Sequence, residues 1–180
     1  MGKQLPGLTA RLKAFIAVQK IFFVATAMKE GRINLSPKGM DALRVLDDNS
    51  LVWLNVTGSG NETATHLRHD GRMTLMFAAF EGPPMILRLY GNARAYHPRD
   101  AYWDAHIGLF PVIPGSRQLI HLDIALVQTS CGMAVPLMEY KADRDLLNAW
   151  AEEKGPEGLQ AYMEAKNTTS LDGYETGIFE

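Results

Sequence analysis

The sequence predicts a mainly β fold with flanking helices (α+β), in which antiparallel strands form one sheet that can close into a barrel. Six or seven segments are rich in β-forming residues, and short turns join many of them. Few helical segments lie between these strands. Antiparallel pairing follows, because parallel neighbours need a long crossover connection. Closing the sheet into a barrel would hide its edge strands.

The individual elements follow from local patterns. Apolar residues at helical spacing, with Thr9 as a cap, predict the first helix. The segment Ser36-Pro37-Lys38-Gly39 is typical of a loop, and Gly155-Pro156 breaks the C-terminal helical region. In chain order we expect a helix at 8–20, strands at 21–26, 33–36, 43–46 and 51–56, a helix at 62–70, strands at 73–80 and 86–96, a helix from Pro98 to about Leu109, a strand at 119–129, and helices at 143–154 and 156–166.

Composition limits the classes of protein to consider. The chain has 180 residues, of which 47% are hydrophobic and 21% charged, an ordinary globular balance that argues against disorder. Its net charge of -2 shows no basic excess, which disfavours nucleic acid as a partner. One cysteine, Cys131, permits no intrachain disulfide. We expect a single domain, with residues 1–20 packed as a helix on a barrel of residues 21–140, and residues 141–180 adding helices and a tail.

No segment approaches the roughly 20 apolar residues of a transmembrane helix, so we expect no membrane association. The N-terminus lacks the apolar run of a signal peptide, and Pro6 stands where a myristoylation motif would have Ser or Thr. These observations favour a cytoplasmic protein.

The segment from Thr57 to Leu67 is the most informative one for function. It consists of a strand end, a glycine-bearing turn and a helix start. Free backbone N–H groups and the positive end of a helix dipole bind anions at such a start, and a phosphate is the natural guest. The alternative interpretation is an ordinary capped helix after a turn, because the Gly-Lys-Ser/Thr ending of a phosphate loop is missing.

Several segments, taken together and in order, resemble the pyridoxamine 5′-phosphate oxidase-like family over about residues 20 to 130. They are Phe22-Phe23-Val24-Ala25-Thr26-Ala27, Asn34-Leu35-Ser36-Pro37-Lys38-Gly39, Arg44-Val45-Leu46, Thr57-Gly58-Ser59-Gly60-Asn61-Glu62-Thr63, Phe80-Glu81-Gly82-Pro83-Pro84 and Arg88-Leu89-Tyr90-Gly91. Thr129-Ser130-Cys131-Gly132 and the stretch from Asn167 to Gly173 resemble a subgroup of that family.

This resemblance implies a homodimer of six-stranded split β-barrels that binds FMN in clefts at the subunit interface. It implies a flavin-dependent oxidoreductase that acts on a small molecule, without indicating which one, and it identifies no catalytic residue and no metal site. The cofactor-binding residues that it implies are Ser36, Lys38, Gly39, Arg44, Asn55, Ser59, Gly60, Asn61, Glu62, Thr63 and Arg88.

One departure from the family pattern concerns the phosphate. The oxidases have Ser-Arg-Lys where this chain has Asn61-Glu62-Thr63, so two cations are lost and an anion appears. Contacts to a phosphate must then come from elsewhere, and Lys38, Arg44, Arg68 and Arg88 are the candidates. The C-terminal Arg and Trp pattern with which the oxidase holds pyridoxamine phosphate is also not evident, so we do not predict that substrate.

Two alternatives to a flavin oxidoreductase stay open. Split barrels also bind F420 and haem, so the chain could be a non-catalytic flavin, F420 or haem-binding protein, or a barrel that has lost its cofactor. Among single residues, we expect Cys131 to be a small buried hydrophobe, His66 to lie on a helix surface, and Trp53 to belong to the core or an interface.

Overall fold

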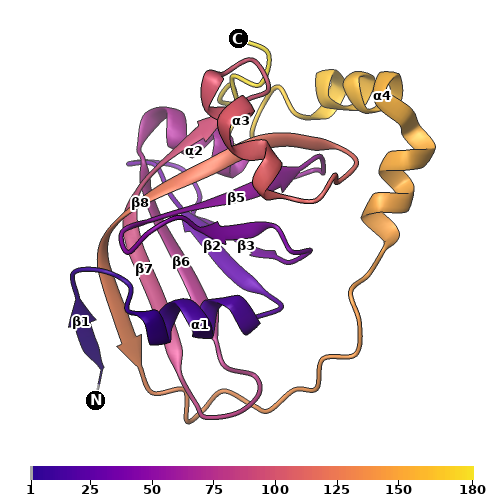
Figure 1. The fold of residues 1–180 in the computed structure, drawn as a ribbon. Helices are drawn as coiled ribbons and strands as arrows, with labels where there is room; N and C mark the ends of the chain where they lie inside the picture. The colour runs from indigo at the N-terminus through magenta and orange to yellow at the C-terminus, as the bar shows by residue number, and fades with distance from the viewer. Residues whose placement is uncertain (1) are drawn as a thin grey trace.

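One curled antiparallel sheet carries the fold (Figure 1). The structure, a computed structural model, describes residues 2–180, and Met1 lies outside the described residues. The strands are β1 (Lys3–Leu5), β2 (Phe22–Thr26), β3 (Asn34–Lys38), β4 (Leu43–Val45), β5 (Ser50–Val56), β6 (Arg72–Ala78), β7 (Ile86–Tyr96) and β8 (Ser116–Ser130). The helices are α1 (Ala10–Val18), α2 (Glu62–His69), α3 (Ala101–His106), the 3₁₀ turn η1 (Ile107–Leu109) and α4 (Leu146–Lys166).

The strand order is β3-β2-β6-β7-β8-β5-β4, with β1 pairing beside it on β8. All pairs are antiparallel, as predicted. Strands β3 and β4 are consecutive in the chain but form opposite edges of the sheet, so the barrel curls without closing by hydrogen bonds at that point. The predicted fold class of a split barrel is confirmed. The sheet has eight strands, against the six that the family resemblance implies, and β1 is the strand that the sequence did not predict.

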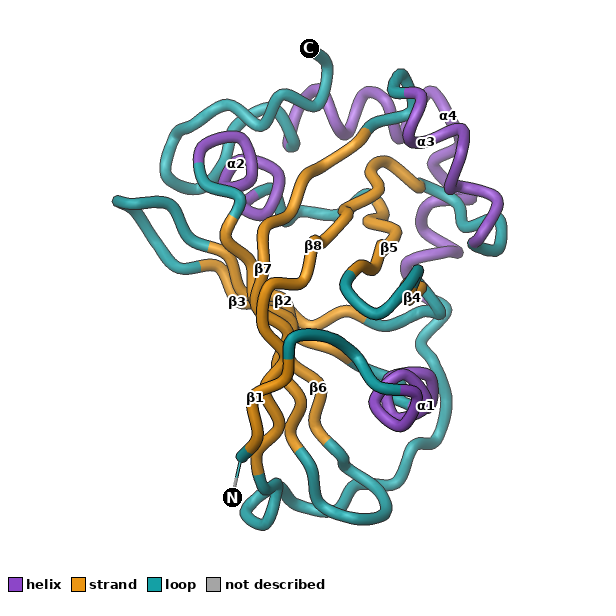
Figure 2. The backbone as a smooth tube through the Cα atoms, turned by 60° about the vertical axis from the view of Figure 1, so that its left-hand side comes forward, coloured by secondary structure: helices purple, strands orange, loops and turns teal. Residues whose placement is uncertain are grey.

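The main core lies on the inner face of the sheet. On β2 the burial alternates, so that Phe22 and Val24 point inward while Phe23 is only half-buried on the outer face. Helix α1 is capped by Thr9, whose Oγ1 accepts the Leu12 N–H at 3.4 Å, and it lays its apolar stripe on this inner face (Figure 2). The apolar periodicity that predicted this helix therefore forms the face that covers the barrel interior, and the predicted cap is present at its start.

The loop predicted at Ser36–Gly39 is wrong, because β3 continues through Pro37 to Lys38. An edge strand pairs on one side only, so a proline can be tolerated there. The turn comes one residue later, where Met40 and Asp41 both have positive φ (69° and 46°). Strand alternation consequently fixes Lys38 on the same face as the inward Phe22 with which it pairs.

Helix α3 begins at Ala101, three residues beyond Pro98, and η1 carries it on to Leu109 as predicted. It covers a smaller second core around Val52, Leu54 and Leu119. The predicted break in the C-terminal helices is confirmed as a kink within α4 at Gly155, whose φ is 62°. Residues 131–145 form a long extended connection to α4 that carries no helix or strand (Figure 1). Within residues 2–180, no helix is long and apolar enough to cross a bilayer.

Candidate functional site

A buried arginine forms hydrogen bonds to the turn between β5 and α2. Arg117, at the start of β8 and 6% exposed, donates from Nη2 to the carbonyl of Gly60 at 2.5 Å and from Nη1 to that of Gly58 at 3.4 Å. A buried guanidinium that bonds two turn carbonyls fixes the shape of the turn. Sequence reasoning missed Arg117, which lies outside the segment that drew attention.

The start of α2 already holds an anion, the carboxylate of Glu62. Its Oε2 accepts the backbone N–H of Asn61 at 3.0 Å, and its Oε1 accepts the backbone N–H of Leu171 at 3.2 Å. Burial alone would raise the pKa of Glu62, but these N–H groups hold it below its ordinary value. A carboxylate is stabilised here by the same free N–H groups and dipole that would attract a phosphate.

The side chain of Asn61 is also occupied. It does not cap α2; its Nδ2 donates to the carbonyls of Lys166 at 2.7 Å and Thr169 at 3.2 Å. Asn167, which is completely buried, donates from Nδ2 to the carbonyl of Gly58 at 2.9 Å and to Asn61 Oδ1 at 2.7 Å. The aperiodic tail is therefore fastened onto the turn by specific polar contacts, which hydrophobic patterning cannot reveal.

Lys38 is the unbalanced charge of this region. Its Nζ lies 5.1 Å from the centroid of the buried Trp53 ring, and no carboxylate within residues 2–180 forms an ion pair with it. Burial, with a contribution from Arg117 and against the pull of Glu62, lowers the pKa of Lys38 to about 8. Burial likewise lowers the pKa of Arg117 to about 10. We call Lys38, Arg117, Glu62 and Trp53 the Lys38 cluster; it holds two cations and one carboxylate.

Three donors in or beside this cluster are buried without a hydrogen-bond partner: Ser36 Oγ, Trp53 Nε1 and Arg117 Nε. Ser36 lies two residues before Lys38 on β3 and therefore on the same face of that strand. Buried polar atoms are almost always paired, so three unpaired donors near Lys38 are an unusual concentration of unsatisfied hydrogen-bonding groups.

Asn55 belongs to a buried chain of polar side chains. Its amide contacts that of Gln118 at 3.0 Å, and Gln118 contacts His97 Nε2 at 3.0 Å. Arg99 Nη2 lies 3.3 Å from His97 Nδ1. Burial, followed by the charge of Arg99, lowers the pKa of His97 to about 4, so the ring is neutral at physiological pH. The chain links the end of β5 to the surface around Arg99.

The other predicted site residues are spread over the molecule. Arg44 forms a bidentate pair with Asp41 at 2.8 and 2.9 Å, and Arg88 lies on the outer face of the sheet, where it donates to Ser130 Oγ at 3.1 Å. Thr63 Oγ1 accepts from Asn34 Nδ2 at 3.0 Å. The structure thus brings Lys38, Gly60 and Glu62 towards Arg117, with Ser36 on the same face of β3 as Lys38. Ser59 is exposed on the turn, and Gly39 lies beside the Lys20 carbonyl. Arg44 and Arg88 lie apart from this group.

Two expectations for single residues are wrong. Cys131 is exposed at the end of β8, because the strand leaves the sheet there, so it is not a buried hydrophobe. His66 is 2% exposed and contacts Thr26 Oγ1 at 3.0 Å, because α2 lays this side on the barrel. Trp53 is fully buried, as predicted for the core.

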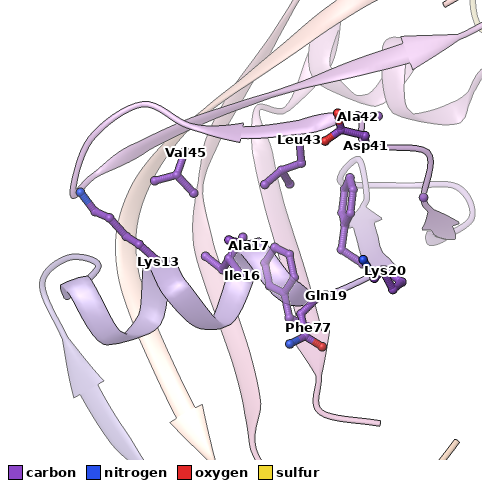
Figure 3. Close-up of a pocket in the computed structure, with 12 residues that line it drawn as sticks. Lys13, Ile16, Ala17, Gln19, Lys20, Asp41, Ala42, Leu43, Val45 and Phe77 are labelled. Atoms are coloured by element: carbon purple, nitrogen blue, oxygen red, sulfur yellow. The ribbon is translucent and has the colours of Figure 1, made fainter. Parts of the chain in front are cut away.

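A separate hollow between α1 and β4 is too small for a cofactor (Figure 3). It measures about 120 Å³, against roughly 300–1,000 Å³ for small-molecule sites. Apolar side chains such as Ile16, Leu43 and Phe77 form its base, and Lys13, Lys20 and Asp41 stand around it. Among the described residues, no group of three or more His, Cys, Asp or Glu side chains could hold a metal ion.

Comparison with known proteins decides the family. The sequence profile described as pyridoxamine 5′-phosphate oxidase matches residues 8–131, more than half of the chain. The chain belongs to the pyridoxamine 5′-phosphate oxidase family. A curated member, the pyridoxamine 5′-phosphate oxidase family protein ustO of Aspergillus flavus, is 37% identical over 185 residues, covering 92% of this chain and 74% of its own length.

Solved structures agree with the split-barrel fold. One described as a pyridoxamine 5′-phosphate oxidase of Lactobacillus delbrueckii has a TM-score of 0.55 at 20% identity and covers 68% of this chain and 94% of its own. A pyridoxamine 5′-phosphate oxidase-related, FMN binding protein of Nostoc punctiforme has a TM-score of 0.50 at 15% identity, with coverage of 69% and 80%. At these identities the likeness concerns the fold alone.

Proposed function

We propose that this member of the pyridoxamine 5′-phosphate oxidase family binds FMN and uses it as an oxidoreductase. The observation that carries the proposal is the Lys38 cluster, in which the buried Arg117 and the half-buried Lys38 face one carboxylate. An uncompensated buried charge is costly, and an anionic ligand would relieve that cost. Membership of the family and the FMN-binding description of the Nostoc relative support a flavin as that ligand.

The orphaned donors fit FMN. Its phosphate and the carbonyl and nitrogen acceptors of its ring suit a region rich in N–H and O–H groups. Ser36 Oγ, Trp53 Nε1 and Arg117 Nε have no hydrogen-bond partner, and because all three atoms are buried, FMN would reach them only after neighbouring side chains move. Lys38 and Arg117 would hold the negative charge in place of the missing family cations. Because Glu62 already fills the start of α2, the anion would bind on the Lys38 side of the turn rather than at the helix end.

FMN, when bound, supplies the electron-transfer chemistry. The chain contributes a proton held at Lys38 Nζ, whose pKa of about 8 keeps it charged at physiological pH. The buried Trp53 ring beneath that ammonium excludes water from one side of it. A cation kept dry and fixed in this way stabilises negative charge on a neighbouring group far better than one in solvent.

The chain would act as a homodimer through the outer face of its sheet. Two rows of half-buried side chains cross this face, and α1 covers the opposite one (Figure 2). The rows contain Leu35, Ala25, Thr74, Tyr90 and Leu126, and Pro37, Phe23, Met76, Arg88 and Gln128. Leu35 is 67% exposed, and apolar side chains such as Leu35, Phe23 and Met76 alternate on this face with polar ones, a mixture that suits an interface between subunits. Arg88 would then face the partner subunit.

A purified sample tests the proposal. We expect a visible absorption spectrum of a flavin, or a rise in melting temperature on addition of FMN, because a ligand that binds only the native state stabilises it. A Soret band would instead support a haem-binding protein. A colourless protein whose melting temperature ignores FMN would contradict flavin binding. If FMN binds but no reductant reduces it, a non-catalytic flavin protein is the better description.

A further inference from the structure

A second cationic cavity lies at the end of the tail, away from the Lys38 cluster. It measures about 380 Å³, within the range of roughly 300–1,000 Å³ typical of small-molecule sites. Three arginines line it, Arg68 from α2, Arg94 from β7 and Arg99 from the loop after β7, together with the tail residues Thr176, Gly177 and Glu180. We call it the arginine pocket.

The chain places its own carboxylate in this pocket. Arg68 Nη2 donates to Glu180 Oε2 at 2.6 Å. Gly177 has a φ of 69°, and a side chain there would collide with the Arg68 guanidinium, so the tail is shaped to admit that group. Arg99 holds the tail from the other side by donating to the carbonyls of Gly177 at 2.9 Å and Ile178 at 2.8 Å.

Positive charge nevertheless remains in excess. Arg94 is exposed and has no hydrogen-bond or ion-pair partner within residues 2–180, so the lining holds three guanidinium groups and one carboxylate. Glu175 adds a weaker interaction with Arg68 from outside the lining. The same local field helps to keep the neighbouring His97 neutral, because Arg99 and Arg68 both lower its pKa after burial does.

We propose that the arginine pocket binds the phosphate group of a small phosphate monoester, which displaces Glu180 from Arg68 and also engages Arg94. Guanidinium groups recognise phosphate through paired, charge-assisted hydrogen bonds. A monocarboxylate would gain little, because Glu180 is tethered and competes at high effective concentration. A phosphate dianion would gain an additional interaction with Arg94, which Glu180 does not contact.

This site would be separate from the FMN site. It is separated from the Lys38 cluster by the buried chain of Arg99, His97, Gln118 and Asn55. Asn55, the last member of this row of side chains, lies at the end of β5, next to the turn that Arg117 contacts. A ligand in the arginine pocket could therefore affect the candidate cofactor region through side chains that are already in contact.

Calorimetric titration with inorganic phosphate at low ionic strength tests the proposal, with acetate as the monoanion. We expect Glu180→Gln to tighten phosphate binding about tenfold and Arg94→Ala to weaken it about tenfold, the effect of roughly one charge-assisted hydrogen bond. Arg72→Ala is the matched control, because Arg72 forms an exposed pair with Asp70 and does not line the pocket. Melting curves check that each variant is folded.

The same titration in Lys38→Met separates this site from the cofactor site. The proposal expects phosphate affinity to persist in that variant whether or not FMN binding is lost. Equal affinities for wild type, Arg94→Ala and Arg72→Ala would overturn it, as would an unchanged or weaker affinity in Glu180→Gln. Acetate binding as tightly as phosphate, or loss of phosphate binding in Lys38→Met, would also overturn it.

Discussion

Lys38 Nζ lies 5.1 Å from the centroid of the buried Trp53 ring, and no carboxylate of residues 2–180 forms an ion pair with this ammonium. The ring face attracts the cation but does not neutralise it. Arg117 and Glu62 complete the surroundings, and their charges act on Lys38 in opposite directions. This ammonium is therefore the group that an anionic ligand would meet.

The first prediction concerns the pH dependence of folding. The pKa of Lys38 is about 8 in the folded chain and near 10.5 when unfolded. Between these values the unfolded chain binds more protons, so the free energy of unfolding rises with pH from about 8 to 10.5. The rise is roughly 3 kcal/mol at most. In Lys38→Met we expect it to disappear, measured by urea denaturation at several pH values, while the surface control Lys154→Met retains it.

The second prediction concerns the pH dependence of flavin binding. A bound anion favours the charged ammonium, so FMN affinity should be nearly constant between about pH 7, where the phosphate is mostly a dianion, and pH 8, and should fall as Lys38 loses its proton above that. We expect about a tenfold weaker affinity per pH unit in that range. Fluorescence titration of FMN at fixed ionic strength measures it. An affinity independent of pH up to 10 would place the phosphate away from Lys38.

The third prediction concerns acid sensitivity. His97 has a folded pKa of about 4 against an ordinary value of 6.5. As the pH falls, His97 takes up a proton in the unfolded chain at a higher pH than in the folded chain. The free energy of unfolding therefore decreases as the pH drops from about 6.5 to 4. The loss is about 3 kcal/mol. We expect His97→Gln to flatten this slope, whereas His106→Gln, on the exterior helix α3, should retain it; equal slopes in both variants would be evidence against the buried neutral ring.

The fourth prediction concerns the tail. Asn167→Ala leaves Asn61 Oδ1 without its donor in a buried setting and leaves the Gly58 carbonyl with only the 3.4 Å contact to Arg117 Nη1. We expect a loss of about 2–4 kcal/mol in the free energy of unfolding and faster hydrogen exchange at Leu171. Asn148→Ala, which removes only an exposed contact to Asp145, serves as the control. A tail that exchanges equally fast in wild type would contradict the fastening seen here.

The fifth prediction concerns assembly. Phe23→Asp puts a charge in the middle of the outer face of the sheet without touching the inner core. We expect wild type to scatter light as a dimer of the 20.0 kDa chain and the variant to scatter as a monomer. A wild-type monomer would exclude the shared interface.

The sequence could predict the barrel because strand alternation, turns and caps are local signals. The helix predicted at 8–20, the neighbouring strands predicted at 43–46 and 51–56, and the break at Gly155 all appear where local chemistry favours them. Pro37 predicted a loop where β3 continues. A proline is compatible with a strand at the edge of a sheet, and only the topology of the sheet shows that β3 is an edge strand.

The candidate site was predictable only in part. The turn from Thr57 to Asn61 stands out in sequence, and Glu62 was recognised as a departure from the family pattern. Arg117 and Asn167 reach this turn from 57 and 109 residues away along the chain, so no local spacing could reveal them. The position of the Glu62 carboxylate at the start of α2 depends in part on its contact with Leu171, which is also distant in the sequence.

The most direct test of the account is a comparison of FMN with riboflavin, which has the same ring but no phosphate, in wild type and in Lys38→Met. We expect wild type to bind FMN at least tenfold more tightly than riboflavin, a difference of about 1.4 kcal/mol. Lys38→Met should lose most of that preference and keep its riboflavin affinity. Equal binding of the two flavins by wild type, or an undiminished preference in Lys38→Met, would contradict the assignment of the Lys38 cluster as the phosphate site.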